Sequence, residues 1–153
     1  MTNAAVAGAV TIGDLVINRL GFGAMRLTGP GIIGPPPNMA AAIQTLQTAR
    51  ELGVTFIDTS NAYGPVISEL LVQKVLHPYN GITIATKGGY TRPGPNKWAH
   101  DDRPEALRAA ARRKRVAKFS ASSASICGNS IASIRTCRWT NSSARSPRCR
   151  RKD

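Results

Sequence analysis

Three side chains able to handle a proton follow two β-type segments of the sequence. Asp58 and Tyr63 flank the stretch Asp-Thr-Ser-Asn-Ala-Tyr-Gly, and Lys87 ends the next β-type segment in Ala-Thr-Lys-Gly-Gly. A tyrosine hydroxyl is a weak acid, with an unperturbed pKa of about 10, but a nearby ammonium group favours the phenolate. A carboxylate paired with that ammonium fixes where it points. The three groups together could donate a proton to a carbonyl that is being reduced by hydride.

Each of the three residues also has a purely structural explanation. Asp58 could cap a helix, Tyr63 could anchor a loop, and Lys87 could be a solvated strand end. Taken one at a time, the structural explanation is favoured. The catalytic interpretation therefore depends on a fold that brings the three together.

Segments of strand type and helix type alternate around these residues. Two short β-type runs on either side of Gly13-Asp14 predict a hairpin, and the apolar segment 20–25 contains two glycines, as a strand does where a ligand approaches its backbone. After a Gly/Pro-rich loop, caps and apolar spacing predict a helix from Asn38 to Gly53, a strand at 54–59, a helix at 65–76, a strand at 82–87 and a helix opening at 103–108. Such alternation predicts a parallel sheet wrapped by helices, with the chemistry at the carboxyl ends of the strands.

These segments resemble the aldo-keto reductase superfamily between about Val10 and Arg108. The resemblance rests on the sequence of residues 20–27, 51–64, 68–69 and 84–89. It implies an NADPH-dependent oxidoreductase that reduces a small aldehyde or ketone. The family's catalytic residues would include Asp58, Lys87 and, as general acid, Tyr63. The nicotinamide end of NADPH would lie near Gly23, Ala24, Met25 and Asp58.

The fold that the resemblance implies is a (β/α)8 barrel, which takes about 250 residues. The chain supplies the N-terminal hairpin and about three βα units of it, so we expect an incomplete barrel with an open edge strand and poor stability. Trp98, in a predicted loop, is a candidate substrate contact or a packing lid. His77 and His100 match no catalytic position of the family and are interpreted as structural or solvated.

A basic segment follows at residues 111–153, after a predicted folded part at 1–110. Residues 109–153 hold 12 Lys or Arg and a single acid, whereas residues 1–108 hold 9 Lys or Arg and 7 acids. All three cysteines lie in the basic part with no metal-ligand spacing, so we expect free thiols and no metal. The Arg/Ser/Ala-rich composition predicts a segment without a packed core.

A change of reading frame is our hypothesis for the basic segment. The family's fourth catalytic residue is a histidine after strand four, and the chain has no histidine beyond His100. Joining the third base of each codon to the first two of the next, with permitted codons, converts residues 124–153 into IDLWQLHRIDPNVPMDEQLGALAEMQKEG, which resembles the missing family segment. The histidine then falls across Ser130 and Ile131. We therefore expect a frame change within about residues 109–120 and no catalytic activity in the chain as it stands.

Two other functions are compatible with the sequence. One is a non-catalytic barrel that senses a nucleotide or binds a partner. The other is a nucleic-acid-binding protein that uses the basic segment, which is disfavoured because no aromatic platform or known motif accompanies the charge. No secretory leader and no stretch of about 18–20 apolar residues is present, so we expect no membrane partner and a cytoplasmic location. The sequence does not predict an oligomeric state.

Overall fold

The computed structural model describes residues 3–12, 15–116 and 125–126, with side chains through Ala110. Its elements are, in chain order, the 3-10 helix η1 (Ala4–Ala7), β1 (Ala9–Ile12), β2 (Leu15–Asn18), β3 (Phe22–Gly23), η2 (Ala24–Leu27), η3 (Pro30–Ile32), α1 (Met39–Glu51), β4 (Phe56–Asp58), α2 (Ile67–Leu76), β5 (Thr83–Lys87), β6 (Tyr90–Gly94), β7 (Lys97–His100), α3 (Pro104–Val116) and β8 (Ser125–Ile126).

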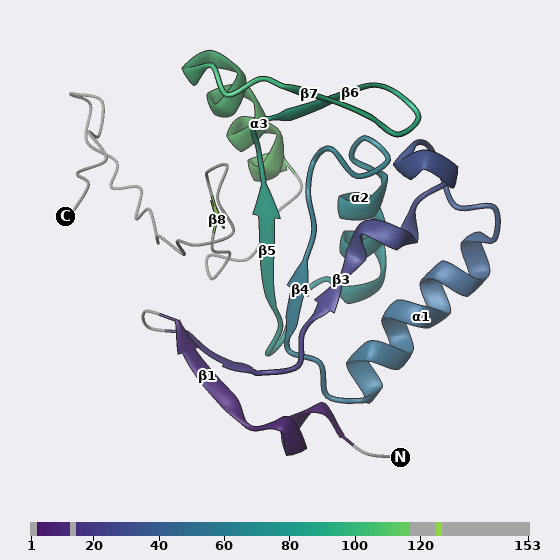
Figure 1. Cartoon of the computed structure of the whole chain (residues 1–153). Helices are drawn as coiled ribbons and strands as arrows, with labels where there is room; N and C mark the ends of the chain where they lie inside the picture. Colours follow the sequence, from purple (N-terminus) through teal and green to yellow (C-terminus); the bar gives the residue numbers. More distant parts are fainter. Residues whose placement is uncertain (1–2, 13–14, 117–124, 127–153) are drawn as a thin grey trace.

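A parallel sheet in the order β3-β4-β5-β8 forms the centre of the molecule. Helices α1 and α2 lie on one side of β3 and β4, while the β1-β2 hairpin lies below the sheet and the β6-β7 hairpin above it (Figure 1). The predicted α/β fold of a hairpin and three βα units is confirmed. Among the described residues the sheet has four strands and does not close into a barrel.

Helix α1 has the ends that the sequence predicts. The Asn38 side chain accepts a hydrogen bond from the backbone N–H of Ala41 at 2.9 Å, which satisfies one of the unpaired donors at the helix start. Gly53 follows the helix with φ +78°, a conformation that glycine adopts without strain. Between these ends, Leu46 and Ala49 face the core.

The core fills the space between these helices and the sheet. Leu46 of α1, Ile57 of β4, and Val72 and Leu76 of α2 are each at most 1% exposed and belong to one hydrophobic cluster. Burial of such side chains contributes about 1.5–3 kcal/mol each. This cluster holds the strand ends that carry the candidate site in fixed relative positions.

Helix α2 begins later than predicted. The expected start was Pro65, but the helix runs from Ile67. Val66 has φ +68°, and its N–H bonds to the carbonyl of Asn61 at 2.8 Å, so the preceding loop turns once more before the helix starts.

The β6-β7 hairpin stands where the sequence predicts only loop. Its strands pair around a turn at Pro95-Asn96, and Asn96 has φ +55°. The Arg-Pro-Gly-Pro run hides the alternation typical of strands, because proline and glycine are depleted in them. Asn96, just before Lys97, is the one local sign of the turn between the two strands, since asparagine tolerates the left-handed conformation of a turn.

Helix α3 continues to Val116, six residues past the predicted end of the folded part at residue 110. Alanine, arginine and lysine have high helix propensity, so the helix extends although apolar periodicity has ended. Backbone pairing of Thr86 and Lys87 with Ser125 and Ile126 means that the carboxyl end of β5 is not the open edge we expected. The predictions for residues 117–124 and 127–153, including the codons across Ser130 and Ile131, lie outside the described residues.

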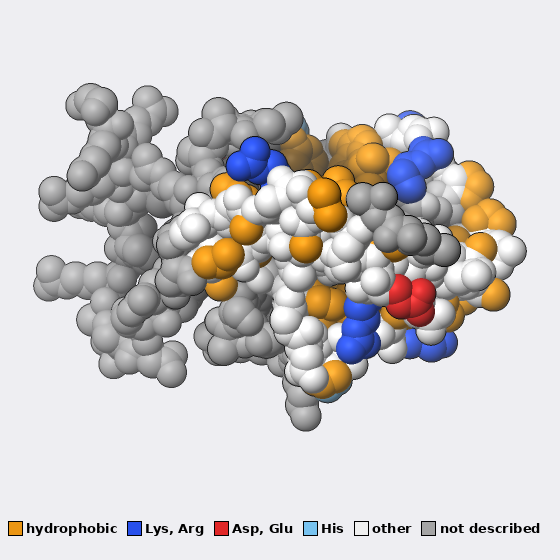
Figure 2. Space-filling model, turned by 90° about the horizontal axis from the view of Figure 1, so that it is seen from below, with side chains coloured by type: hydrophobic (Ala, Val, Ile, Leu, Met, Phe, Trp, Pro, Cys, Tyr) orange, Lys and Arg blue, Asp and Glu red, His pale blue; other side chains and the backbone are white. Residues whose placement is uncertain are grey.

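Apolar side chains remain exposed at the N-terminal end of the chain. Val6, Val16 and Leu20 are 76%, 72% and 54% exposed. Seen from below, hydrophobic side chains are scattered over the molecule, with Lys or Arg and acidic side chains among them (Figure 2). In the described part of the chain no helix is long and apolar enough to cross a membrane, and no group of three potential metal ligands occurs.

Candidate active site

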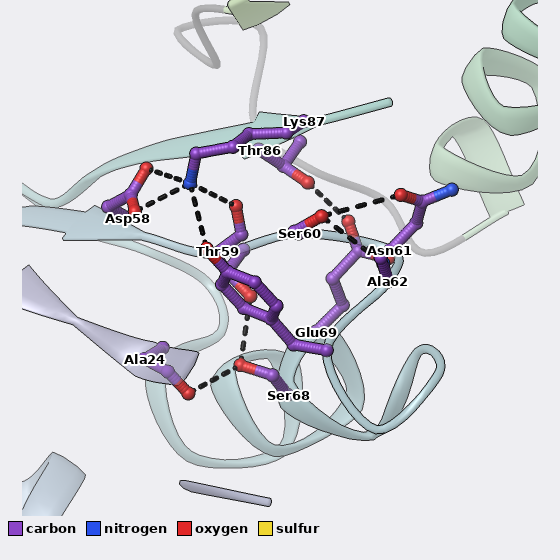
Figure 3. A network of polar contacts seen from close by, with 11 residues as sticks. Ala24, Asp58, Thr59, Ser60, Asn61, Ala62, Ser68, Glu69, Thr86 and Lys87 are labelled. Atoms are coloured by element: carbon purple, nitrogen blue, oxygen red, sulfur yellow. Dashed lines mark hydrogen bonds and ion pairs between the residues drawn. The ribbon is translucent and has the colours of Figure 1, made fainter. Parts of the chain in front are cut away.

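The structure brings the three predicted acid–base residues together, and Figure 3 shows the contact between Lys87 and Asp58. The Lys87 ammonium lies 2.6 Å from both carboxylate oxygens of Asp58. It also donates to the Tyr63 hydroxyl oxygen at 3.3 Å and to the main-chain carbonyl of Thr59 at 3.1 Å. Because the ammonium is the donor, the phenolic proton of Tyr63 is not used in this bond.

The parallel strands place Asp58 and Lys87 on the same side of the sheet. Asp58 is the last residue of β4 and is in register with Ala85 of β5, so Lys87 lies two residues further along. Side chains two residues apart on a strand share a face. The long lysine side chain can therefore turn back over Ala85 to reach the carboxylate.

A compact loop between β4 and α2 carries Tyr63. The Tyr63 N–H bonds to the Ser60 carbonyl at 3.1 Å, and the Ser60 hydroxyl accepts from the N–H of Ala62 at 3.2 Å. Ser60 and Ala62 are buried, whereas Tyr63 is partly exposed. The loop is thus fixed by its own hydrogen bonds and presents the phenol next to Lys87, whose ammonium is 5.2 Å from the ring centre.

The Asp58–Lys87 pair is half exposed, at 35% and 36% of the side-chain surface. Ion pairs in contact with water contribute at most about 1 kcal/mol to stability. Its main effect is therefore geometric, because the carboxylate holds the ammonium beside the Tyr63 hydroxyl.

The residues predicted to lie near a cofactor take three different environments. Gly23 is exposed and in register with Asp58, and a Cβ added to it would meet nothing within 4 Å. Met25 is partly buried and lines a cavity of about 350 Å³ with Arg26 and the 28–32 segment. Ala24 is fully buried, and its carbonyl accepts a hydrogen bond from Ser68, so its side chain faces the core.

The β6-β7 hairpin forms an aromatic wall beside Tyr63. The Trp98 ring packs edge-on against Tyr63 and Tyr90, at centroid distances of 6.4 and 6.0 Å. Arg92 covers Trp98, with its guanidinium carbon 3.8 Å from the ring centre. The sequence singled out Trp98 but missed Arg92 and Tyr90, because the hairpin that groups them was not predicted.

Each of the two histidines packs against a tyrosine ring. The His77 ring packs against Tyr79 at 5.5 Å, and the His100 ring against Tyr90 at 4.6 Å.

Burial raises the pKa of Tyr79 to about 12, and the Glu69 carboxylate adds to the rise. The hydrogen bond from Arg103 lowers the pKa of Asp101, in an exposed turn before α3.

Comparison with known proteins identifies the family. A profile described as the Aldo/keto reductase family matches residues 19–117 of the chain. The chain belongs to the aldo/keto reductase family. It is 51% identical over 106 residues to an uncharacterized oxidoreductase of Schizosaccharomyces pombe (69% of this chain, 35% of that protein) and 45% identical over 89 residues to the pyridoxine 4-dehydrogenase of Escherichia coli K12 (58% and 31%). The chain thus spans about a third of the length of these curated relatives.

Solved aldo-keto reductases share the fold of the described part. A glycerol dehydrogenase from Gluconobacter oxydans matches with a TM-score of 0.59 and 28% identity, covering 71% of this chain and 36% of that one. An aldo-keto reductase from Bacillus halodurans, in its holo form, matches with 0.57 and 26%, covering 71% and 35%. Family and relatives together support an oxidoreductase function.

Proposed function

We propose that the described residues form the proton-donating part of an NADPH-dependent reductase of aldehydes or ketones. The observation that carries the proposal is the position of the Lys87 ammonium, which contacts the Asp58 carboxylate at 2.6 Å and the Tyr63 hydroxyl at 3.3 Å. An ammonium fixed beside the hydroxyl would stabilise the phenolate that proton donation leaves behind.

Each residue has a distinct role in the proposed reaction. Tyr63 gives its hydroxyl proton to the oxygen of the substrate carbonyl, whose carbon has accepted the hydride, so that an alcohol forms. Lys87 stabilises the phenolate that remains, and Asp58 keeps the ammonium in place. Trp98 stands beside Tyr63 and would contact the substrate from the hairpin side.

NADPH would supply the hydride at the carboxyl end of β3. The open space at Gly23, opposite Asp58, leaves room for a flat ring next to the carboxylate. In this proposal Met25 also contacts the cofactor, and Ala24 contributes through its backbone, because its side chain is buried. The choice of NADPH over NADH comes from the family resemblance, and two relatives carry names of dehydrogenases for pyridoxine and glycerol.

We further propose that the segment after about residue 110 is read out of frame, and that the 153-residue chain therefore does not catalyse the reaction. The support is the sequence itself, which has no histidine after His100, whereas permitted codons for Ser130 and Ile131 would give one in the shifted frame. Sequencing the gene across codons 105–120 tests this part: a one-base lesion relative to close relatives is expected, and an intact frame would contradict it. The cytoplasm stays the predicted compartment.

The proposed activity is tested by comparing the 153-residue chain with a protein whose frame is restored within codons 109–120. We expect aldehyde-dependent oxidation of NADPH only from the restored protein. We also expect NADPH to raise the melting temperature only of that protein, since a ligand stabilises a folded state that contains its site by about 2.7 kcal/mol at a hundredfold excess over Kd. A restored, folded protein without turnover would refute the proposed function, and turnover by the 153-residue chain would refute the proposed inactivity.

A further inference from the structure

Four buried polar side chains lie directly behind the candidate active site. Thr59 and Ser68 are completely buried, and Thr86 and Glu69 are 2% and 6% exposed. The Thr59 and Ser68 hydroxyls are 2.9 Å apart, and the Thr86 hydroxyl donates to a carboxylate oxygen of Glu69 at 2.5 Å. None of the four residues is among the proposed catalytic groups.

Each buried threonine is the chain neighbour of a charged site residue. Thr59 follows Asp58, and Thr86 precedes Lys87. Successive side chains of a strand point to opposite faces, so the two threonines reach toward α2 while the charged pair meets on the other face. Figure 3 shows the Thr59 and Thr86 side chains in contact with Ser68 and Glu69 of α2, and the Lys87 amine turned toward Asp58.

Ser68 and Glu69, neighbours in the first turn of α2, connect the carboxyl ends of three strands. The Ser68 hydroxyl donates its one proton to the carbonyl of Ala24, just after β3, at 3.0 Å. The Thr59 hydroxyl must then be the donor in its bond with Ser68. With Glu69 bound to Thr86, one helical turn contacts the ends of β3, β4 and β5.

Burying these four polar side chains costs free energy, which suits a place where the relative positions of the strand ends must be fixed. A buried carboxylate or hydroxyl loses its hydration, and apolar side chains of similar size pack between a helix and a sheet without that cost. Hydrogen bonds fix relative positions more narrowly than apolar contacts do, and buried ones act in a low dielectric. The half-exposed Asp58–Lys87 pair, in contrast, gains little from its own attraction.

We propose that Ser68 and Glu69 are positioning residues, which hold the strand ends so that Lys87 stays between Asp58 and Tyr63. They act through Thr59 and Thr86 and do not touch the substrate. The catalytic importance of this positioning rests on the proposed function. The position of the Lys87 ammonium itself can be tested without measuring turnover.

The test is the reactivity of the Lys87 amine in the full 153-residue chain, measured by acetylation for limited times and peptide mass spectrometry. Lys74 and Lys97, labelled in the same molecules, are internal references. In the unmodified chain we expect Lys87 to react more slowly than both. In Thr86→Val, which removes the hydroxyl and keeps the shape, we expect the relative rate at Lys87 to rise about fivefold, the factor for one hydrogen bond of about 1 kcal/mol.

Matched variants separate positioning from general loosening. Thr86→Ser keeps the hydroxyl and should retain the slow rate, and Glu69→Gln keeps an acceptor and should do the same. Ser68→Ala should raise the rate as Thr86→Val does. Thr83→Val makes the same change at the other end of β5 and should leave the relative rate within about twofold, well below the factor for one hydrogen bond.

An unchanged rate at Lys87 in both Thr86→Val and Ser68→Ala would overturn the inference. So would an equal rise in Thr83→Val, or failure of Thr86→Ser to retain the slow rate. The labelling needs no cofactor or substrate. If the acetylation rate at Lys87 changes in these variants as expected but the frame-restored protein reduces no carbonyl, the proposed function is refuted and the positioning role is not.

Discussion

Replacing Arg92 with lysine should destabilise the described part of the chain, because one guanidinium joins two separate segments. Arg92 donates to the carbonyl of Lys97 at 2.8 Å within its own hairpin, and to the carbonyls of Ile32 and Gly31 at 3.0 and 2.5 Å. It also stacks on Trp98 at 3.8 Å. The Asn96 N–H bonds to the same Gly31 carbonyl at 3.0 Å, so the hairpin tip lies on this loop.

The size of the effect follows from what a lysine can replace. An ammonium is compact and can satisfy about one of the three carbonyls, and it cannot stack as a planar guanidinium does. Two hydrogen bonds of a partly exposed group, at about 0.7 kcal/mol each, and a cation–π contact of about 0.5 kcal/mol give a loss of about 2 kcal/mol. For a folded part of this size that corresponds to a fall in Tm of roughly 8–16 °C.

Thermal unfolding followed by circular dichroism measures this loss, with Arg103→Lys as the matched control. Arg103 is 68% exposed and pairs with Asp101 at the surface, so the same substitution there should leave the Tm almost unchanged. In a Trp139→Phe background Trp98 is the only tryptophan, and its emission should shift to the red in Arg92→Lys. Equal Tm values for the two variants and an unshifted emission would refute the reasoning.

Two further predictions concern pH and salt. Since the folded pKa of Tyr79 is about 12 and the unfolded value about 10, the unfolded chain loses this proton first, so the free energy of unfolding should fall as pH rises from 10 to 12. Tyr79→Phe should show a smaller fall in urea titrations across this range, and an identical fall would contradict the pKa difference. Any DNA binding by the 153-residue chain should be weak, without sequence preference and steeply lowered by salt, because only counterion release is available to it; salt-resistant, sequence-selective binding in a filter assay would revive the nucleic-acid function.

Much of the fold was predictable because local signals agreed with the final arrangement. Asn38 and Gly53 delimit α1 as their chemistry requires, and apolar runs mark β4 and β5. The proximity of Asp58 and Lys87 also followed, since carboxyl ends of neighbouring parallel strands lie at one edge of a sheet.

The features that could not be predicted depend on contacts between distant segments. The β6-β7 hairpin is held by Arg92 against a loop about 60 residues earlier, and no local pattern reveals that pairing. The roles of Ser68 and Glu69 likewise arise only when α2 packs behind the strand ends. The extension of α3 past residue 110 is a different case, because the helix propensity of alanine, arginine and lysine is a local signal, and the loss of apolar periodicity hides it.

The most direct test of the account is the turnover of Tyr63→Phe in the frame-restored protein, with Tyr79→Phe as the matched control. Phenylalanine keeps the ring against Trp98 but removes the hydroxyl beside Lys87. General acid catalysis contributes typically 10²–10⁴-fold, so kcat for aldehyde reduction should fall by about that factor while the Kd for NADPH changes little. Tyr79→Phe should retain kcat. A Tyr63→Phe protein with unreduced kcat would show that Tyr63 is not the proton donor and would contradict the central claim.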